Sequence, residues 1–169
     1  MKRFLVPVFG AVLVIALAVQ GPAASSRAPK VLEFDTMGAV VGPFVGADNP
    51  IRGVNGGGLP WQIAEGRGEL TGGGKLDVEV RGLVLLDGAP VPPERRGTNP
   101  IPNFRAIVSC LTIVDGDAAT ANVATGPLPA TPTGDSEIQA TVALPSPCLA
   151  PIVFVGPSAT TWFAVTGQA

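Results

Sequence analysis

The sequence predicts an all-β domain, namely an antiparallel β-sandwich of about eight strands, with a β-barrel as the alternative. The 169-residue chain contains 22 glycines and 18 prolines, which disfavour long helices. Between these turn-forming residues lie short runs rich in β-branched and other apolar residues, the pattern expected for strands. The expected strands span residues 31–37, 61–70, 75–86, 104–114, 120–125, 137–144, 152–155 and 161–166.

The first 25 residues are predicted to be a signal peptide. Two basic residues follow Met1, an apolar stretch runs from Phe4 to Val19, and the small residues of "QGPAASS" complete the pattern. Cleavage after Ser25 would leave one all-β domain, residues 26–169. A transmembrane anchor is the alternative, but the apolar stretch is shorter than the roughly 20 residues that a span requires. We therefore expect a protein that is secreted, extracellular or in the cell envelope, with no membrane span after cleavage.

The charge of the mature chain excludes one class of partner. Removal of the signal peptide leaves nine basic and thirteen acidic residues, a net charge near −4. Nucleic acids and anionic membranes attract clustered positive charge, and the longest basic run is the pair Arg95-Arg96. Nucleic acid is therefore not an expected partner. An extracellular ligand or a component of the cell envelope is the partner class that remains.

Two cysteines, Cys110 and Cys148, are predicted to form a disulfide. After a signal peptide, an even number of cysteines indicates an oxidised pair, and two cysteines allow one intramolecular pairing. A zinc site is excluded because two thiols without any histidine do not complete the usual four ligands.

The stretch "GRGELTGGGK", residues 66–75, has the glycines and the lysine of a phosphate-binding loop. Its spacing is wrong, because a P-loop would require glycine where Glu69 stands and serine or threonine where Leu76 stands. The "LDVEVRG" that follows alternates like a strand, whereas phosphate loops precede a helix. The sequence therefore predicts no nucleotide and no other cofactor.

The same stretch fits the tip of a β-hairpin, with Gly72–Gly74 as a three-residue connection that needs one residue of positive φ. The two strands then come into a definite register. The opposed pairs include Leu70 with Leu76, Arg67 with Glu79, Glu65 with Arg81, Ile63 with Leu83 and Trp61 with Leu85. One pair brings like charges together, Glu69 and Asp77, a repulsion that Lys75 could relieve. The hairpin base is apolar on both faces and must be covered by other parts of the chain.

Two further strands carry clear patterns. Residues 137–144 alternate, with Ile138 and Val142 among the inward positions and Glu137 and Gln139 among the outward ones. Residues 104–114 are apolar on both faces beyond Arg105, which predicts a central strand covered on both sides.

Three long, turn-rich segments, residues 42–60, 87–103 and 126–136, are predicted to gather at the end of the domain opposite the hairpin tip. This end is the candidate ligand-binding pole. Its arginines could bind an anionic ligand and its tryptophan could stack on a sugar, although neutralised arginines and a core tryptophan are the structural alternatives. The candidate residues are Arg52, Trp61, Arg95 and Arg96.

Catalysis is not expected, because the usual side chains are missing. The chain has no histidine and no tyrosine, which excludes Ser–His–Asp and Cys–His arrangements and phenolic acids or bases. A carboxylate-dependent glycan hydrolase is the alternative, with Glu65 and Glu79 on one strand surface as candidate residues. Asp115 and Asp117 could assist a calcium ion, but two acids do not complete a site and their turn position explains them.

Several stretches resemble a group of secreted β-rich proteins of Gram-positive, actinobacterial-type bacteria with no assigned activity. They are "GGGLPWQI", "VEVRGLVL", "NPIPNFRAIVSC", "LPSPCLAPIVFV" and "WFAVTG". The resemblance covers nearly all of the mature chain and implies a secreted single domain with paired cysteines. It implies no activity. From the sequence we therefore expect a non-catalytic extracellular binding or structural module.

Overall fold

The computed structural model describes residues 28–166, so the predicted signal peptide lies outside the described residues. The described chain is all-β, with 52% strand, and forms a sandwich in which no sheet closes into a barrel. No helix in this part of the chain is long and apolar enough to cross a membrane. The helices described are two single 3-10 turns, η1 (Gly42–Phe44) and η2 (Pro93–Arg95).

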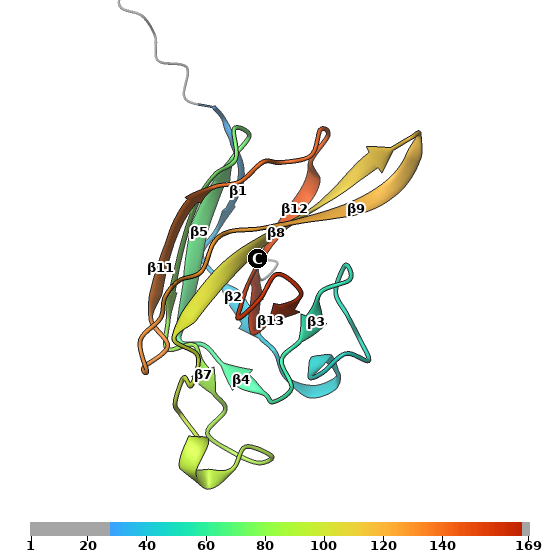
Figure 1. The fold of residues 1–169 in the computed structure, drawn as a ribbon. Helices are drawn as coiled ribbons and strands as arrows, with labels where there is room; N and C mark the ends of the chain where they lie inside the picture. The colour runs from blue at the N-terminus through green and yellow to red at the C-terminus, as the bar shows by residue number, and fades with distance from the viewer. Residues whose placement is uncertain (1–27, 167–169) are drawn as a thin grey trace, which may run out of the picture.

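Two antiparallel sheets face each other (Figure 1). Sheet 1 has the order β1-β5-β6-β11, and sheet 2 has the order β10-β8-β12-β14-β2, with β9 also paired to β8. The strands of sheet 1 are β1 (Lys30–Phe34), β5 (Glu65–Thr71), β6 (Lys75–Arg81) and β11 (Ser136–Thr141). Those of sheet 2 are β2 (Met37–Ala39), β8 (Asn103–Val114), β9 (Asp117–Ala124), β10 (Leu128–Pro129), β12 (Leu149–Gly156) and β14 (Ala164–Thr166).

Two short pairs complete the fold. β3 (Asn55–Gly56) runs parallel to β13 (Thr161–Trp162), and β4 (Trp61–Gln62) runs antiparallel to β7 (Val84–Leu85). The prediction treated the last two as the base of the long hairpin. The structure instead separates them from sheet 1, because Gly82 turns the chain with a φ of 62°. The predicted pair of Trp61 with Leu85 is confirmed. The expected pair of Ile63 with Leu83 belongs to neither described ladder, and the Ala64 N–H donates to the Arg81 carbonyl beside it.

The predicted hairpin between β5 and β6 is confirmed residue by residue. The observed pairs run from Glu65 with Arg81 to Leu70 with Leu76. Of the three glycines at the tip, Gly74 is the one with positive φ, 83°, and its N–H donates to the Thr71 carbonyl. A turn followed by a left-handed residue is the usual geometry of a three-residue hairpin loop.

β8 is central, as predicted, but only over part of its length. Ala106 to Cys110 are fully buried, with odd and even positions covered on opposite faces of sheet 2. Beyond Cys110 the cover is incomplete: Thr112 is still buried, but Leu111, Ile113 and Val114 are 42%, 54% and 55% exposed. β8 and β9 therefore continue as a two-stranded ribbon that projects from the sandwich at the upper right of Figure 1.

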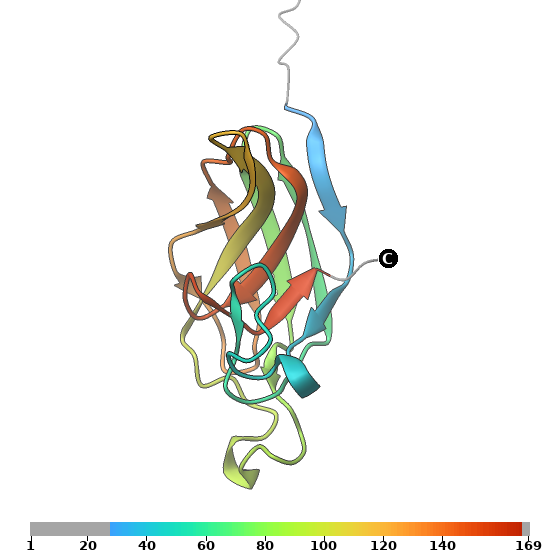
Figure 2. The same ribbon diagram turned by 90° about the vertical axis from the view of Figure 1, so that its right-hand side faces the viewer.

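Each face of sheet 2 has its own aromatic cluster. Between the sheets, Trp61 stacks on Phe163 with ring centroids 3.8 Å apart, and both rings contact Phe104 edge-on. On the outer face, Trp162 lies 5.9 Å from Phe154 and 6.4 Å from Phe44 of η1. The segment of residues 42–60 thus covers the outer face of sheet 2, in front of the sheet in Figure 2.

The predicted disulfide is confirmed. Cys110 of β8 and Cys148, just before β12, have an S–S distance of 2.04 Å and Cα atoms 5.0 Å apart. The bond joins the two central strands of sheet 2 at the point where the buried part of β8 ends.

Candidate functional site

The four residues predicted for a ligand-binding pole do not form one site. Trp61 is 3% exposed and has its ring between Phe163 and Phe104, so it offers no free face to a sugar. Arg95 and Arg96 belong to η2 and its end, on the loop at the bottom of Figure 1, where Arg96 Nε donates to the Val91 carbonyl. The loop is opposite the hairpin tip, as expected.

Arg52 lies elsewhere and has a structural role that the sequence did not indicate. Its Nη1 donates to the carbonyls of Ser109 and Ala150, at 3.0 and 2.9 Å. These carbonyls lie where the pairing of β12 with β8 is irregular, between Leu149 and Ile152. The guanidinium therefore supplies the donors that a regular ladder would have provided. The Arg52 carbonyl in turn accepts a hydrogen bond from Asn122 Nδ2 of β9.

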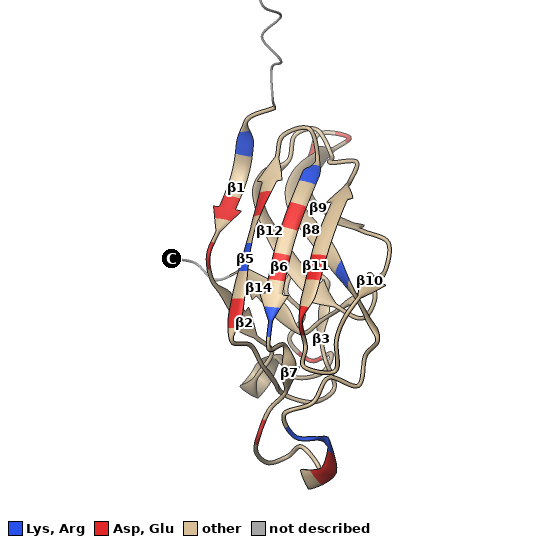
Figure 3. Cartoon of the chain, turned by 90° about the vertical axis from the view of Figure 1, so that its left-hand side faces the viewer, with Lys and Arg blue, Asp and Glu red and all other residues tan. Residues whose placement is uncertain are grey.

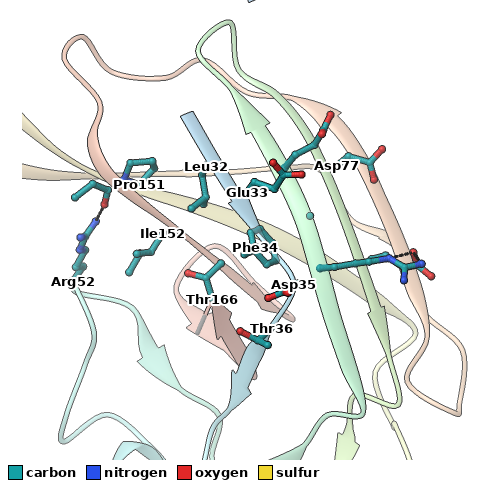
Figure 4. A pocket seen from close by; sticks show the side chains of 15 residues that line it. Leu32, Glu33, Phe34, Asp35, Thr36, Arg52, Asp77, Pro151, Ile152 and Thr166 are labelled. Carbon is teal, nitrogen blue, oxygen red and sulfur yellow. Dashed lines mark hydrogen bonds and ion pairs between the residues drawn. The ribbon is translucent and has the colours of Figure 1, made fainter. Parts of the chain in front are cut away.

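A groove of about 1110 Å³ lies beside β1, at the open edge of the sandwich (Figure 4). We call it the β1 groove. Leu32 and Phe34 of β1 line it on one side, and Pro151 and Ile152 of β12 line it on the other, with Arg52 and Thr166 nearby. These side chains give the groove an apolar floor.

One edge of β1 is unpaired among the described residues. β1 is the terminal strand of sheet 1 and pairs with β5 alone, through Leu32 with Leu70 and Phe34 with Gly68. On an edge strand, every second residue directs its N–H and C=O away from the sheet. The β1 groove therefore combines apolar side chains with backbone hydrogen-bonding groups.

The outer face of sheet 1 is acidic next to the groove, as the bands in Figure 3 show. Glu33, Glu69 and Asp77 stand side by side in register across β1, β5 and β6. The repulsion expected between Glu69 and Asp77 is eased by Lys30, not by Lys75: Lys30 Nζ lies 2.7 Å from Glu69 and 2.9 Å from Glu33. Hydrogen bonds to Glu69 and then to Glu33 raise the pKa of Lys30 above its ordinary value.

The next row along the face is a network of charges. Arg67 and Arg81 both bind the Glu79 carboxylate, and Arg81 also reaches Glu137 at 3.0 Å. The hydrogen bonds from Arg67 and then from Arg81 lower the pKa of Glu79. The groove is lined by the carboxylates of Glu33, Asp35, Glu69, Asp77 and Glu79 and by the guanidinium groups of Arg52 and Arg67. Lys30 and Arg81 pair with three of these carboxylates from beside the groove, which leaves a small excess of negative charge at its rim. This excess favours a cationic ligand.

This geometry bears on the alternative of a glycan hydrolase. A glycosidase pair needs one carboxyl group that stays protonated to act as an acid. Hydrogen bonds from Arg67 and Arg81 instead lower the pKa of Glu79 and so favour its ionised form. Glu65, the other candidate, is exposed at the start of β5, opposite Arg81. Glu79 could serve only as a base or nucleophile, and both of its oxygens already accept hydrogen bonds from arginines.

Asp115 and Asp117 flank the turn of the projecting ribbon, as the sequence predicted. Asp115 and Gly116 have φ values of 53° and 92°, so this is a two-residue hairpin loop with left-handed central residues. Backbone geometry thus explains the residue types. No cluster of acids, cysteines or histidines suited to a metal ion occurs among residues 28–166.

Sequence reasoning missed the groove because its two sides lie more than a hundred residues apart. A local signal was present: "LEFD", residues 32–35, alternates apolar with acidic side chains. That alternation indicates a half-buried strand, but its open edge and the facing β12 depend on the packing of the whole chain.

Comparisons of the chain with protein-family models, with curated proteins and with solved structures find no match. The resemblance to secreted actinobacterial-type proteins therefore stays a prediction, and the site must be interpreted from its own geometry.

Proposed function

We propose that this protein is a non-catalytic extracellular binding module whose β1 groove holds an extended polypeptide in which basic and apolar residues alternate. The single observation that carries the proposal is the groove itself: an apolar floor, an acidic rim and an unpaired strand edge occur together along β1. Secretion is part of the proposal, and the Cys110–Cys148 disulfide supports it, because disulfides persist in oxidising compartments.

An added strand fits the groove in a definite way. A polypeptide paired with the open edge of β1 would extend sheet 1 through backbone hydrogen bonds, and pockets for alternate side chains would select its sequence. Its inward side chains would contact Leu32, Pro151 and Ile152. Its outward side chains would lie beside Glu33 and Asp35, so lysine or arginine is favoured there.

Other occupants fit less well. A second copy paired through β1 would bring the Glu33 and Asp35 carboxylates of two chains together, which is repulsive. An anionic polymer or membrane would meet the same acidic rim. The glycan-hydrolase alternative relies on Glu79, whose lowered pKa disfavours the role of general acid.

The proposal is tested with synthetic peptides of about eight residues, the length of an ordinary strand. One peptide alternates lysine with valine, and its control alternates glutamate with valine. In calorimetric titrations of the mature protein we expect the lysine peptide to bind, more weakly at high salt, and the glutamate peptide not to bind. Mass spectrometry should recover the bound peptide uncleaved.

Charge-reversal variants locate the site. Glu33→Lys combined with Asp35→Lys should weaken the lysine peptide about tenfold or more. Glu94→Lys in η2 makes the same kind of change far from the groove and should leave binding unchanged. Equal binding by all variants, or binding of neither peptide, would refute the proposed ligand. Turnover of a glycan panel that disappears in Glu65→Gln or Glu79→Gln would instead favour the hydrolase.

A further inference from the structure

β9 is the longest edge strand of sheet 2, and no residue after its first one is charged. Its eight residues, Asp117–Ala124, carry one charge, Asp117, at the very start. The segment from Ala118 to Ala124 contains no proline, and its side chains are small or of medium size. β9 pairs with β8 on one side and with nothing on the other among residues 28–166.

The other edges of sheet 2 are protected in the ways that natural proteins use, because β10 contains Pro129 and β2 is only three residues long. The edge of β1 in sheet 1 is open, but its acidic side chains disfavour a second copy of this chain. Charges, prolines, bulges and short length all discourage pairing with another chain. β9 has none of these features along its interior, and it projects from the body of the molecule (Figure 1).

The turn fixes which backbone groups of β9 are free. A two-residue loop closes on a hydrogen-bonded pair, here Val114 with Asp117, and such pairs recur at every second residue. The other end of β9 shows the same alternation, because Thr125 donates its N–H to the Ala106 carbonyl of β8. Ala119, Ala121 and Val123 therefore point their N–H and C=O groups toward β8. The outward groups belong to Ala118, Thr120, Asn122 and Ala124.

We propose that two copies of this protein associate by antiparallel pairing of their β9 edges, about a twofold axis at Ala121. This register places Thr120 opposite Asn122 and Ala118 opposite Ala124, so every outward backbone group of the strand meets a partner. Because this twofold axis is perpendicular to the sheet, the outer faces of the two copies of sheet 2 lie on the same side of the joined sheet. Inward, Ala119 lies opposite Val123, and the small side chains fit.

Charge does not oppose a second copy as the occupant. In this register Asp117 lies opposite Thr125 of the second copy, so the two Asp117 carboxylates do not face each other. Pairing joins the two copies of sheet 2 into one continuous sheet. A membrane is disfavoured because Asp115 and Asp117 stand at the exposed tip of the ribbon. The proposal does not depend on the β1 groove, because β1 belongs to sheet 1 and does not pair with β9.

Light scattering coupled to size exclusion tests the association. Over concentrations from about 1 µM to about 1 mM, the range of weak to moderate affinity, the mass should rise from one chain to two. Thr120→Lys places two like charges near the axis and should keep the protein monomeric. Thr120→Val is the matched neutral control and should still dimerise. A single-chain mass throughout, or a dimer unaffected by Thr120→Lys, would overturn the proposal.

Hydrogen exchange of the unmodified protein provides the second measurement. The amides of Ala119, Ala121 and Val123 should be protected at every concentration, because they bond to β8. Those of Ala118, Thr120, Asn122 and Ala124 should become protected only at high concentration. Mixing Thr120→Cys with Asn122→Cys protein under mild oxidation should cross-link the two variants to each other. Cross-linking of Thr120→Cys protein with itself alone would contradict the register.

Discussion

Arg52 exemplifies how one residue can have the features of a ligand contact and yet support the fold. It occupies a left-handed backbone conformation, with a φ of 49°, and its guanidinium bonds to two carbonyls that lie far apart in sequence. No sequence pattern marks such a role, because the irregularity in β12 that it compensates is itself not visible in the sequence.

Arg52→Ala should lower the free energy of unfolding by about 2 kcal/mol, because two carbonyls lose their donor. Arg95→Ala, a matched change at an exposed arginine on η2, should change it by less than about 0.5 kcal/mol. Denaturant unfolding measures both values. Equal effects of the two substitutions would show that the Arg52 contacts contribute nothing specific.

Asp135 makes stability depend on pH. The Gly82 N–H donates to its carboxylate at 2.9 Å, and this bond, followed by one from Thr133, lowers the pKa of Asp135 below its ordinary value. A lowered folded-state pKa stabilises the protein above the unfolded pKa, and the contribution is lost as pH falls through the folded value. Asp135→Asn should therefore destabilise at neutral pH, by less than about 1 kcal/mol after solvent screening.

The difference between the Asp135→Asn variant and the parent should shrink as the pH is lowered through the range below about 4, where free aspartate titrates. Asp48→Asn is the matched control for the loss of one carboxylate, because Asp48 is exposed and its carboxylate accepts no hydrogen bond among those described. Melting temperatures measured across pH provide the comparison. A constant difference at all pH values would contradict the assignment.

At the scale of elements, the β5–β6 hairpin was predictable and its surroundings were not. Register within a hairpin follows from local turn chemistry and cross-strand pairs, so the positions from Glu65 to Arg81 could be counted from the sequence. The points where the chain leaves sheet 1, at Gly82 and between β1 and β2, could not be predicted from the sequence. At both points the chain moves to another pairing partner, and the strand-like composition continues across them.

The hairpin tip yields a direct test of backbone conformation. A Cβ at Gly74 would lie 2.0 Å from the Val142 carbonyl oxygen, at a φ of 83°, whereas at Gly72 the nearest atom would be 3.5 Å away. Gly74→Ala should therefore cost about 2–4 kcal/mol and Gly72→Ala less than about 1 kcal/mol. Thermal unfolding of the two variants distinguishes them. A similar loss for both would mean that the tip does not constrain the chain.

For the whole molecule, composition and periodicity sufficed for the fold class but not for the site. Glycine, proline and alternating runs predicted a sandwich. The candidate pole failed to assemble because the segment of residues 42–60 folds over sheet 2, while the loop with Arg95 and Arg96 extends away. The β1 groove arises only when β1 and β12 come together, which depends on long-range packing.

The disulfide acts at this same scale. Cys110 and Cys148 are 38 residues apart, and their bond restricts the unfolded chain. The double variant Cys110→Ala with Cys148→Ala should lose roughly 2–4 kcal/mol of stability. Denaturant unfolding measures the loss, and mass spectrometry of non-reduced protein should find two hydrogens fewer than in the reduced form. Unchanged stability would mean that restriction of the unfolded chain by this bond does not contribute to the stability of the fold.

The position of β2 dictates when this protein can fold. β2, near the start of the described chain, pairs with β14 at its end, through Met37 with Thr166 and Ala39 with Ala164. Sheet 2 therefore stays incomplete until β14 has been synthesised. Such non-local closure is slow, so sheet 2 keeps an unpaired edge that is open to aggregation until β2 and β14 meet.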